Sequence, residues 1–290
     1  MHRLSLPLTC AALALVFQPP VALAHDYSRA CCEPYSGGCG GSSLPNSCDN
    51  TDNMASEIAS RLGNWSAGFS FRNGDVDPVD FQDEVKDASG NDDVVMDHVG
   101  DADLVVWSGH GTTTASDPDD TWSAWMGTPS PVNSDCDADT PQEMIFGEQG
   151  SDGYGGNGDA EFVIMDASCS TLLDERFDVW ENFGPGIMGR VHQGMGFNDS
   201  PNDASQRLEN FIERIDAGDS NGEAWLDAGR HCVLGVCENA PVAIAHGSDS
   251  TDANDRWDDE SMASPDTDPP MWGGSYHWET VGSTGNDCNQ

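Results

Sequence analysis

The spacing of apolar residues changes along the chain and predicts where its strands lie. Between Trp65 and Phe71, apolar residues alternate with small or polar ones, which is the pattern of a strand with one buried face. Elsewhere the apolar residues run continuously, as they do in strands that are buried on both faces of a sheet. These runs predict further strands at 103–107, 161–165, 187–197 and 240–245.

Apolar residues three or four positions apart predict helices among these strands. The clearest helix has Ser200 as its N-cap, Pro201 in its first turn and Gly218 at its end. Further helices are expected at 54–62, 80–88 and 171–183. Strands that alternate with helices imply an α/β fold, with a mainly parallel sheet and helices on both faces.

The first 24 residues are typical of a secretory signal peptide. They combine one arginine, an apolar run and the small-residue end Ala22-Leu23-Ala24. We therefore expect a secreted protein that is cleaved near Ala24. Lipid attachment at Cys10 is the weaker alternative, because most of the apolar run follows that residue. No later stretch has the roughly 20 consecutive apolar residues of a membrane span, so no membrane association is expected.

Composition suggests how the rest of the chain is divided. Residues 25–50 are rich in Cys, Gly and Ser and are expected to form an N-terminal cap. The α/β domain follows at 51–247, with a long insertion on the rim of the sheet at about 112–159. Residues 248–290 are acidic and show no periodicity, which predicts an irregular C-terminal extension.

The charge of the chain excludes two classes of partner. There are 51 acidic residues against 11 basic ones, and the formal net charge is −40. A surface of this sign repels nucleic acid and anionic lipid, so neither is an expected partner. Salt or bound divalent cations would screen the self-repulsion, which suggests a saline setting.

Nine cysteines remain after Cys10 is removed with the signal peptide. In an oxidising compartment thiols pair, and an odd number leaves at least one unpaired. Cys31, Cys32, Cys39 and Cys48 could form disulfides or bind zinc. Their irregular spacing favours disulfides.

Two of the predicted strands end in residues that can do chemistry. The run at 103–107 leads into Ser-Gly-His110-Gly, and the run at 161–165 leads into Asp-Ala-Ser-Cys169-Ser. Neighbouring parallel strands place their carboxyl ends side by side, so we expect the imidazole and the thiol to meet. The N-terminus of the helix that follows Cys169 would lower the pKa of its thiol. Cys169 is therefore the candidate nucleophile and unpaired cysteine, with His110 as its base.

Each half of this pattern also has a simpler interpretation. His-Gly after a strand is often only a turn, and a single buried cysteine is usually a small apolar residue. Both strands, their order and the unpaired thiol together make a more specific signal. His246, at the end of the 240–245 run, is a rival base. It follows the cysteine in the chain.

An apolar strand that ends in His-Gly, followed later by one that ends in Asp-x-Ser-Cys, resembles the caspase-like cysteine peptidases such as gingipains, legumains, clostripain and metacaspases. Among these, the secreted bacterial family DUF6345 looks most similar, on its Ser-Gly-His-Gly signature and a later Cys followed by Ser-x-Leu. The resemblance covers about residues 63–247 and rests mainly on two short motifs. It implies a three-layer caspase-like sandwich.

The resemblance also implies the roles of individual residues. Cys169 would attack the peptide carbonyl, and His110 would protonate the leaving amine. The backbone N–H groups of Gly111 and Cys169 would hold the oxyanion. Asp166 matches an acid that often precedes the family's cysteine, without a settled role. His192 is a second candidate pocket residue. A purely structural role explains this histidine equally well.

Calcium is considered because of the acidity and because related secreted peptidases often use it. Asp135, Asp137 and Asp139 alternate as in a calcium loop, but Thr140 stands where a glycine is needed. The stretch 219–222 lacks its first ligand. A solvated acidic surface is the preferred explanation, with weak calcium binding as the alternative. No metal site is assigned, and no cofactor is required.

The expected function is that of a secreted cysteine endopeptidase that acts on peptide or protein substrates. The first alternative is a catalytically inactive binding module of the same fold, and the second is a disulfide-held extracellular structural protein. A bridged Cys169 would favour the second, and a free thiol of ordinary pKa the first.

Overall fold

The computed structural model describes residues 25–35, 42–76, 102–111, 125–132, 135–139, 161–168, 170, 191–230, 232–233, 236–237, 239–265 and 275–281. The expected signal peptide, the helices expected at 80–88 and 171–183, and most of the 112–159 insertion lie outside these residues. So does Cys169.

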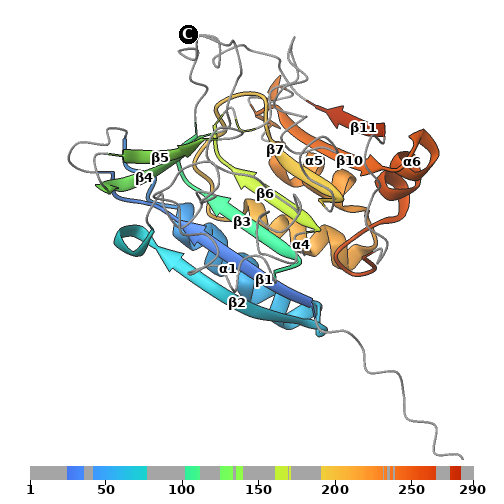
Figure 1. Cartoon of the computed structure of the whole chain (residues 1–290), viewed down its shortest axis with the longest axis horizontal. Helices are drawn as coiled ribbons and strands as arrows, with labels where there is room; N and C mark the ends of the chain where they lie inside the picture. Colours follow the sequence, from blue (N-terminus) through green and yellow to red (C-terminus); the bar gives the residue numbers. More distant parts are fainter. Residues whose placement is uncertain are drawn as a thin grey trace, which may run out of the picture.

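A seven-stranded mixed sheet forms the centre of the protein, in the order β11-β10-β7-β6-β3-β1-β2 (Figure 1). Neighbours among β2, β1, β3, β6 and β7 pair in parallel, whereas β10 is antiparallel to both β7 and β11. The strands are β1 His25–Cys31, β2 Trp65–Arg72, β3 Leu104–Ser108, β6 Phe162–Asp166, β7 Gln193–Phe197, β10 Pro241–Gly247 and β11 Ser275–Thr280.

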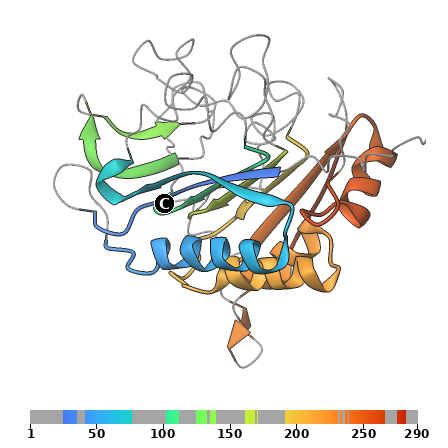
Figure 2. The same ribbon diagram turned by 90° about the horizontal axis from the view of Figure 1, so that it is seen from below.

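The described helices lie mainly on one face of this sheet. Helices α1 Ser47–Arg61, α4 Arg207–Ala217 and α5 Asn221–Gly229 cover that face (Figure 2), and α6 Ser250–Asp259 packs against β10 and β11. The α/β prediction is thus confirmed at the level of a mixed sheet with helices. Helices on both faces, as in a three-layer arrangement, stay a prediction, since two of the expected helices lie outside the described residues.

The remaining described elements are short. They are the 3₁₀ turn η1 Asn73–Asp75, the pair β4 Trp125–Val132 and β5 Asp135–Asp139, and the pair β8 Cys232–Val233 and β9 Val236–Cys237. None of the helices within the described ranges combines the length and hydropathy of a membrane span.

The core explains why the central strands read as continuous apolar runs. Leu104 of β3 and Phe162 of β6 face the helices and pack in one cluster with Ile58 of α1 and Phe211 of α4. The intervening residues, among them Trp107, are equally buried on the other face. A strand buried on both faces needs apolar residues at every position.

Both ends of the α/β unit differ from the sequence analysis. Residues 25–31, expected in a separate cap, form β1, which lies between β2 and β3 inside the sheet. Residues 250–259 and 275–280, expected to be irregular, form α6 and the edge strand β11. Neither β1 nor β11 shows an apolar run. Strand β11 lies at the edge of the sheet and is partly exposed, whereas the polar side chains of β1 find partners on other elements. Arg29, for example, pairs with Asp52 of α1.

The best-predicted helix begins later than expected. Helix α4 starts at Arg207, not after Ser200, and ends as predicted at Gly218, which has a φ of 104°. The preceding residues instead form a loop in which Asp199 accepts a hydrogen bond from the Ser200 N–H at 2.7 Å. This loop brings residues 201–207 to the edge of the cleft described below.

One disulfide joins Cys31 at the end of β1 to Cys48 in the first turn of α1. The prediction of disulfide bonding within residues 25–50 is therefore confirmed for Cys31 and Cys48. Cys32 is a free, fully buried cysteine. An unpaired thiol is thus already present at position 32, so an odd cysteine count does not by itself single out Cys169.

Candidate functional site

A cleft of about 190 Å³ lies at the carboxyl ends of β3 and β6. The two strands are parallel neighbours, and Ser108 is paired in register with Asp166. The Gly109 N–H then donates to the Asp166 carbonyl at 3.3 Å, which holds the two strand ends together. Residues 42–47 and 201–207 contribute the other walls. This is the edge of the sheet at which the sequence placed the reactive groups.

His110 is partly exposed at this edge and is held from two sides. Its backbone N–H donates to the Tyr35 hydroxyl at 2.9 Å, and the two rings meet edge to face with centroids 4.2 Å apart. Its Nε2 lies 2.6 Å from the Ser42 carbonyl oxygen. A carbonyl can only accept, so in this arrangement Nε2 carries the hydrogen. In the neutral ring Nδ1 is then the basic nitrogen.

Gly111 packs directly against the turn that leads to Cys169. A Cβ at position 111 would lie 2.8 Å from the Ala167 Cβ and closer still to the Ser168 carbonyl oxygen. No side chain fits in that space, so glycine is needed for the approach. Cys169 itself lies outside the described residues, but Ser168 before it lines the cleft together with His110.

The residue after Cys169 anchors the same turn. Ser170 is fully buried, and its hydroxyl donates to the Met165 carbonyl at 2.9 Å. The Ser170 hydroxyl oxygen also accepts a hydrogen bond from the Phe197 N–H of β7 at 3.1 Å. The Ser170 hydroxyl therefore ties the carboxyl ends of β6 and β7 together.

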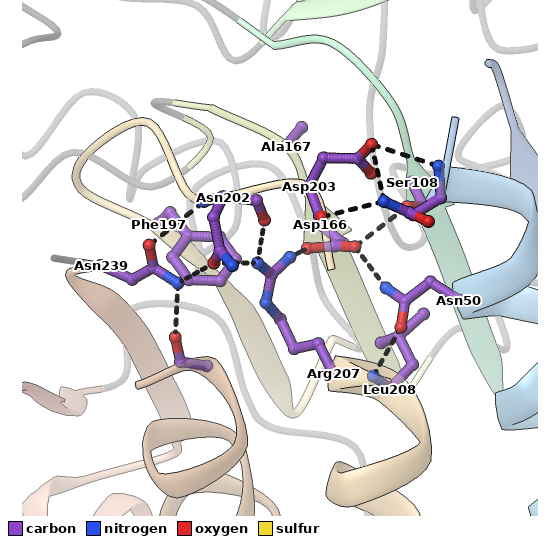
Figure 3. Close-up of polar contacts among 12 residues, drawn as sticks. Asn50, Ser108, Asp166, Ala167, Phe197, Asn202, Asp203, Arg207, Leu208 and Asn239 are labelled. Atoms are coloured by element: carbon purple, nitrogen blue, oxygen red, sulfur yellow. Dashed lines mark hydrogen bonds and ion pairs between the residues drawn. The ribbon is translucent and has the colours of Figure 1, made fainter. Parts of the chain in front are cut away.

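Asp166 is the centre of a buried polar network beneath the cleft (Figure 3). Its carboxylate forms an ion pair with Arg207 and accepts hydrogen bonds from Asn50 Nδ2 at 2.6 Å and from the Ser108 hydroxyl at 2.9 Å. The Asp166 and Arg207 side chains are each only 4% exposed. Asp166 does line the cleft, but its oxygens are committed to protein partners, which favours a positioning role over a catalytic one.

Arg207 extends this network to the neighbouring loop. Its guanidinium donates to the carbonyl and the side-chain oxygen of Asn202, which in turn accepts from Asn239 at 2.7 Å (Figure 3). Its Cζ lies 4.8 Å from the centre of the Phe197 ring. Carboxylate, amide and aromatic partners together offset the cost of burying the charge.

Asp203 is the second carboxylate at this cleft. It accepts hydrogen bonds from the backbone and side chain of Asn46 at 3.1 and 3.2 Å. Burial raises the pKa of Asp203, and the nearby Asp166 adds to the rise, whereas Asn46 and Arg207 oppose it. Residue 46 precedes α1 and residue 203 precedes α4, so this contact joins the two segments that lead into these helices.

Arg207 and Asn50, the two main partners of Asp166, were not predicted from the sequence. One signal was available for Arg207. A cation at the first position of a helix opposes the helix dipole, and this chain has only 11 basic residues. Asn50 carries no such signal, since it is one polar residue within a helix.

Cys32 lies next to Tyr35, the residue that contacts His110, but it is poorly suited to be the nucleophile. It is fully buried next to Tyr35, and burial raises the pKa of its thiol to about 12. Burial also raises the pKa of the Tyr35 hydroxyl. At neutral pH both groups therefore keep their protons.

The structure does not bring His192 to the cleft. His192 was expected to end a strand, but it immediately precedes β7, and its N–H donates to the Glu161 carbonyl at 2.7 Å. It therefore lies at the amino ends of the parallel strands, the edge opposite to His110. There it is 2% exposed, with Nδ1 2.6 Å from Glu260 Oε1. The structural alternative thus holds for this histidine.

His246 is excluded as a rival base by the direction of its strand. Because β10 runs antiparallel to β7, the carboxyl end of β10 lies at the amino edge of the parallel strands. The His246 N–H donates to the His192 carbonyl at 2.8 Å, which places both histidines on that edge. His110 is thus the histidine among the described residues that lines the cleft.

Burial of His246 predicts acid sensitivity of the fold. The side chain is 1% exposed, and burial, with Arg256 and His192 nearby, lowers its pKa from 6.5 to about 4. Between these values the unfolded chain binds a proton that the folded chain does not. The contribution of neutral His246 to the free energy of unfolding is therefore fully present above pH 6.5. It falls by about 3 kcal/mol as the pH drops toward 4.

Urea unfolding of the wild type and of His246→Leu at several pH values measures this effect. The difference in unfolding free energy between the two proteins should shift in favour of the variant as the pH falls. His277→Leu, on the edge strand β11, serves as control. The pH dependence of its unfolding free energy should match that of the wild type. A pH-independent difference for His246→Leu would contradict the assignment.

The calcium candidates remain weak. Asp135, Asp137 and Asp139 lie in β5, whose side chains are not among the described ones. In the other stretch, Asp219 pairs with Arg214 at 2.9 Å, and Asn221 is the first residue of α5. That stretch is therefore the start of a helix rather than a cation-binding loop.

Comparison with known proteins places the chain in one family. None of the curated proteins compared with it matches. The family described as Domain of unknown function (DUF6345) matches residues 33–280, which include β3, β6 and the whole cleft edge described above. The chain therefore belongs to the DUF6345 family.

Proposed function

We propose that this protein is a secreted cysteine endopeptidase of caspase-like fold, in which Cys169 is the nucleophile and His110 the proton donor and acceptor. The observation that carries the proposal is the contact between Gly111 and the turn at residues 167–168. Through that contact the residue after His110 touches the residues that precede Cys169. Parallel pairing of β3 with β6 supports the same juxtaposition.

The state of His110 suits this role. Donation from Nε2–H to the Ser42 carbonyl leaves Nδ1 as the basic nitrogen, and the Tyr35 ring restricts the imidazole plane. Proton transfer requires a base that is oriented toward the nucleophile, and these contacts supply orientation without occupying Nδ1. In this scheme Tyr35 and Ser42 are positioning residues.

The reaction consists of two ordinary acyl-transfer steps. The Cys169 thiolate attacks the carbonyl carbon of the peptide, and the C–N bond breaks as protonated His110 gives its proton to the leaving amine. Water then attacks the thioester, with His110 taking a proton from it, and the acid and thiolate are released. The N–H groups of Gly111 and Cys169 would stabilise the oxyanion of both steps.

The buried network gives the cleft a rigid floor. Asp166, Arg207 and Asn50 link β6, α4 and α1, which all border the cleft. A side-chain constellation held by such a second layer keeps its geometry during the reaction. In this proposal Asp166 positions the strand ends and does not touch the substrate.

Alkylation of the purified, unreduced protein across pH tests the proposal. An iodoacetamide probe should label Cys169 below about pH 7 in the wild type, because an imidazolium neighbour stabilises its thiolate. In His110→Ala the same labelling should require a pH of about 8.5, the ordinary pKa of a free thiol. Peptide mass analysis identifies the labelled cysteine.

Cys32 provides the internal control. It should remain unlabelled in the folded protein, because it is fully buried and its pKa is raised to about 12. A Cys169 that is disulfide-bonded would overturn the proposal. A free Cys169 with an ordinary pKa in both proteins would favour the inactive binding module.

A further inference from the structure

A second cluster of chemically active side chains lies at the amino ends of the parallel strands, opposite to the cleft. His25 begins β1, Asp103 immediately precedes β3 and Glu161 immediately precedes β6. Each residue offers one ligand atom, and these atoms all lie within 4.8 Å of one another. We propose that His25, Asp103 and Glu161 bind a divalent transition-metal ion of the zinc type.

Neighbouring strands preorganise the three residues. The Glu161 N–H donates to the Asp103 carbonyl at 2.9 Å, and the Asp26 N–H donates to Asp103 Oδ2 at 2.6 Å. The His25 ring lies over Trp65, with centroids 5.1 Å apart and planes inclined by 30°. Donors mounted on adjacent strands keep their spacing, so binding an ion would require little reorganisation.

The His25 imidazole lies at ion-pair distance from Asp103 without forming a hydrogen bond to it. His25 Nδ1 is buried and has no hydrogen-bond partner within the described part of the chain, although it lies 3.3 Å from Asp103 Oδ2. A buried nitrogen without a hydrogen bond is unfavourable. Coordination to a metal would use the Nδ1 lone pair and satisfy this atom.

Charge supports the same conclusion. Two partly buried carboxylates at this separation repel each other, and a doubly charged ion between them removes the repulsion. The side chains of His25 and Asp103 are 13% and 19% exposed, so the site is reachable by solvent but only partly screened.

The donor set selects the kind of metal. Calcium prefers six to eight oxygen ligands, whereas one imidazole and two carboxylates suit zinc and similar ions. Three protein ligands also leave a coordination position for water. A metal here would clamp β1, β3 and β6 at the edge of the sheet remote from His110, so the inference is independent of the proposed peptidase function.

Zinc titration of the chelator-treated full-length protein tests the site. Calorimetry should show one tight equivalent, and the midpoint of thermal unfolding should rise. High salt and excess Mg²⁺ in the buffer suppress loose binding by the acidic surface. His25→Gln and Asp103→Asn should each weaken zinc binding about tenfold or more. The control variants His277→Gln and Asp75→Asn should bind zinc as the wild type does.

Unfolding in the presence of chelator separates loss of the site from loss of the fold. Without metal, Asp103→Asn should remain folded, because the amide keeps an oxygen for the Asp26 N–H. The rise in the midpoint of thermal unfolding on adding zinc should then disappear only in His25→Gln and Asp103→Asn. No tight equivalent in the wild type, or unchanged affinity in His25→Gln, would overturn the proposal.

Discussion

Replacing Cys169 with alanine is expected to lower kcat/KM for peptide hydrolysis by about 10⁴-fold or more, because in the proposed mechanism the Cys169 thiolate forms the acyl-enzyme. His110→Ala should cost about 10²- to 10⁴-fold through loss of general acid–base catalysis. The double variant should be little worse than Cys169→Ala alone, since the two residues act as one unit. A quenched fluorescent peptide library measures the activity without assuming a side-chain preference.

Two matched controls make this result specific. Cys32→Ser removes the buried thiol that lies beside Tyr35, and His277→Ala removes a histidine on the edge strand β11. Both should retain kcat/KM within a few-fold. Hydrolysis that survives in Cys169→Ala but is lost in Cys32→Ser would refute the assignment of the nucleophile.

The second large effect concerns stability. Asp166→Asn should lower the free energy of unfolding by about 3–5 kcal/mol, because it leaves the Arg207 guanidinium buried without its counter-charge. Both side chains are 4% exposed, so solvent cannot replace the lost partner. Arg207→Met should lower the free energy of unfolding by a similar amount, since it leaves the Asp166 carboxylate buried without its counter-charge. Urea unfolding followed by circular dichroism measures both variants.

The double variant and a surface pair supply the comparison. Asp166→Asn combined with Arg207→Met removes both charges, so its loss should be clearly smaller than the sum of the single losses. Arg61→Met breaks contacts with Glu57, Glu213 and Asp216 on the surface and should have a much smaller effect. Additive losses in the buried pair would show that the two charges do not stabilise each other.

The sequence by itself determined the central strands and the end of the clearest helix. Strands β3 and β6 are buried on both faces, so residues 104–107 and 162–165 are all apolar, and this pattern is local. Gly218 adopts a positive φ that other residues disfavour, so its position marks the end of α4. The approach of His110 to the turn before Cys169 followed from one general rule, that neighbouring parallel strands end on the same edge.

Only the tertiary structure decided which polar residues meet and on which edge each histidine lies. His192 and His246, like His110, flank apolar strands. His192 immediately precedes the parallel strand β7, whereas His246 lies near the carboxyl end of the antiparallel strand β10, so both lie at the opposite edge. Asn50 and Arg207 reach Asp166 from α1 and α4, across 116 and 41 residues of chain. An apolar period reports the local environment of each residue, whereas the partner of a buried charge depends on how distant elements pack.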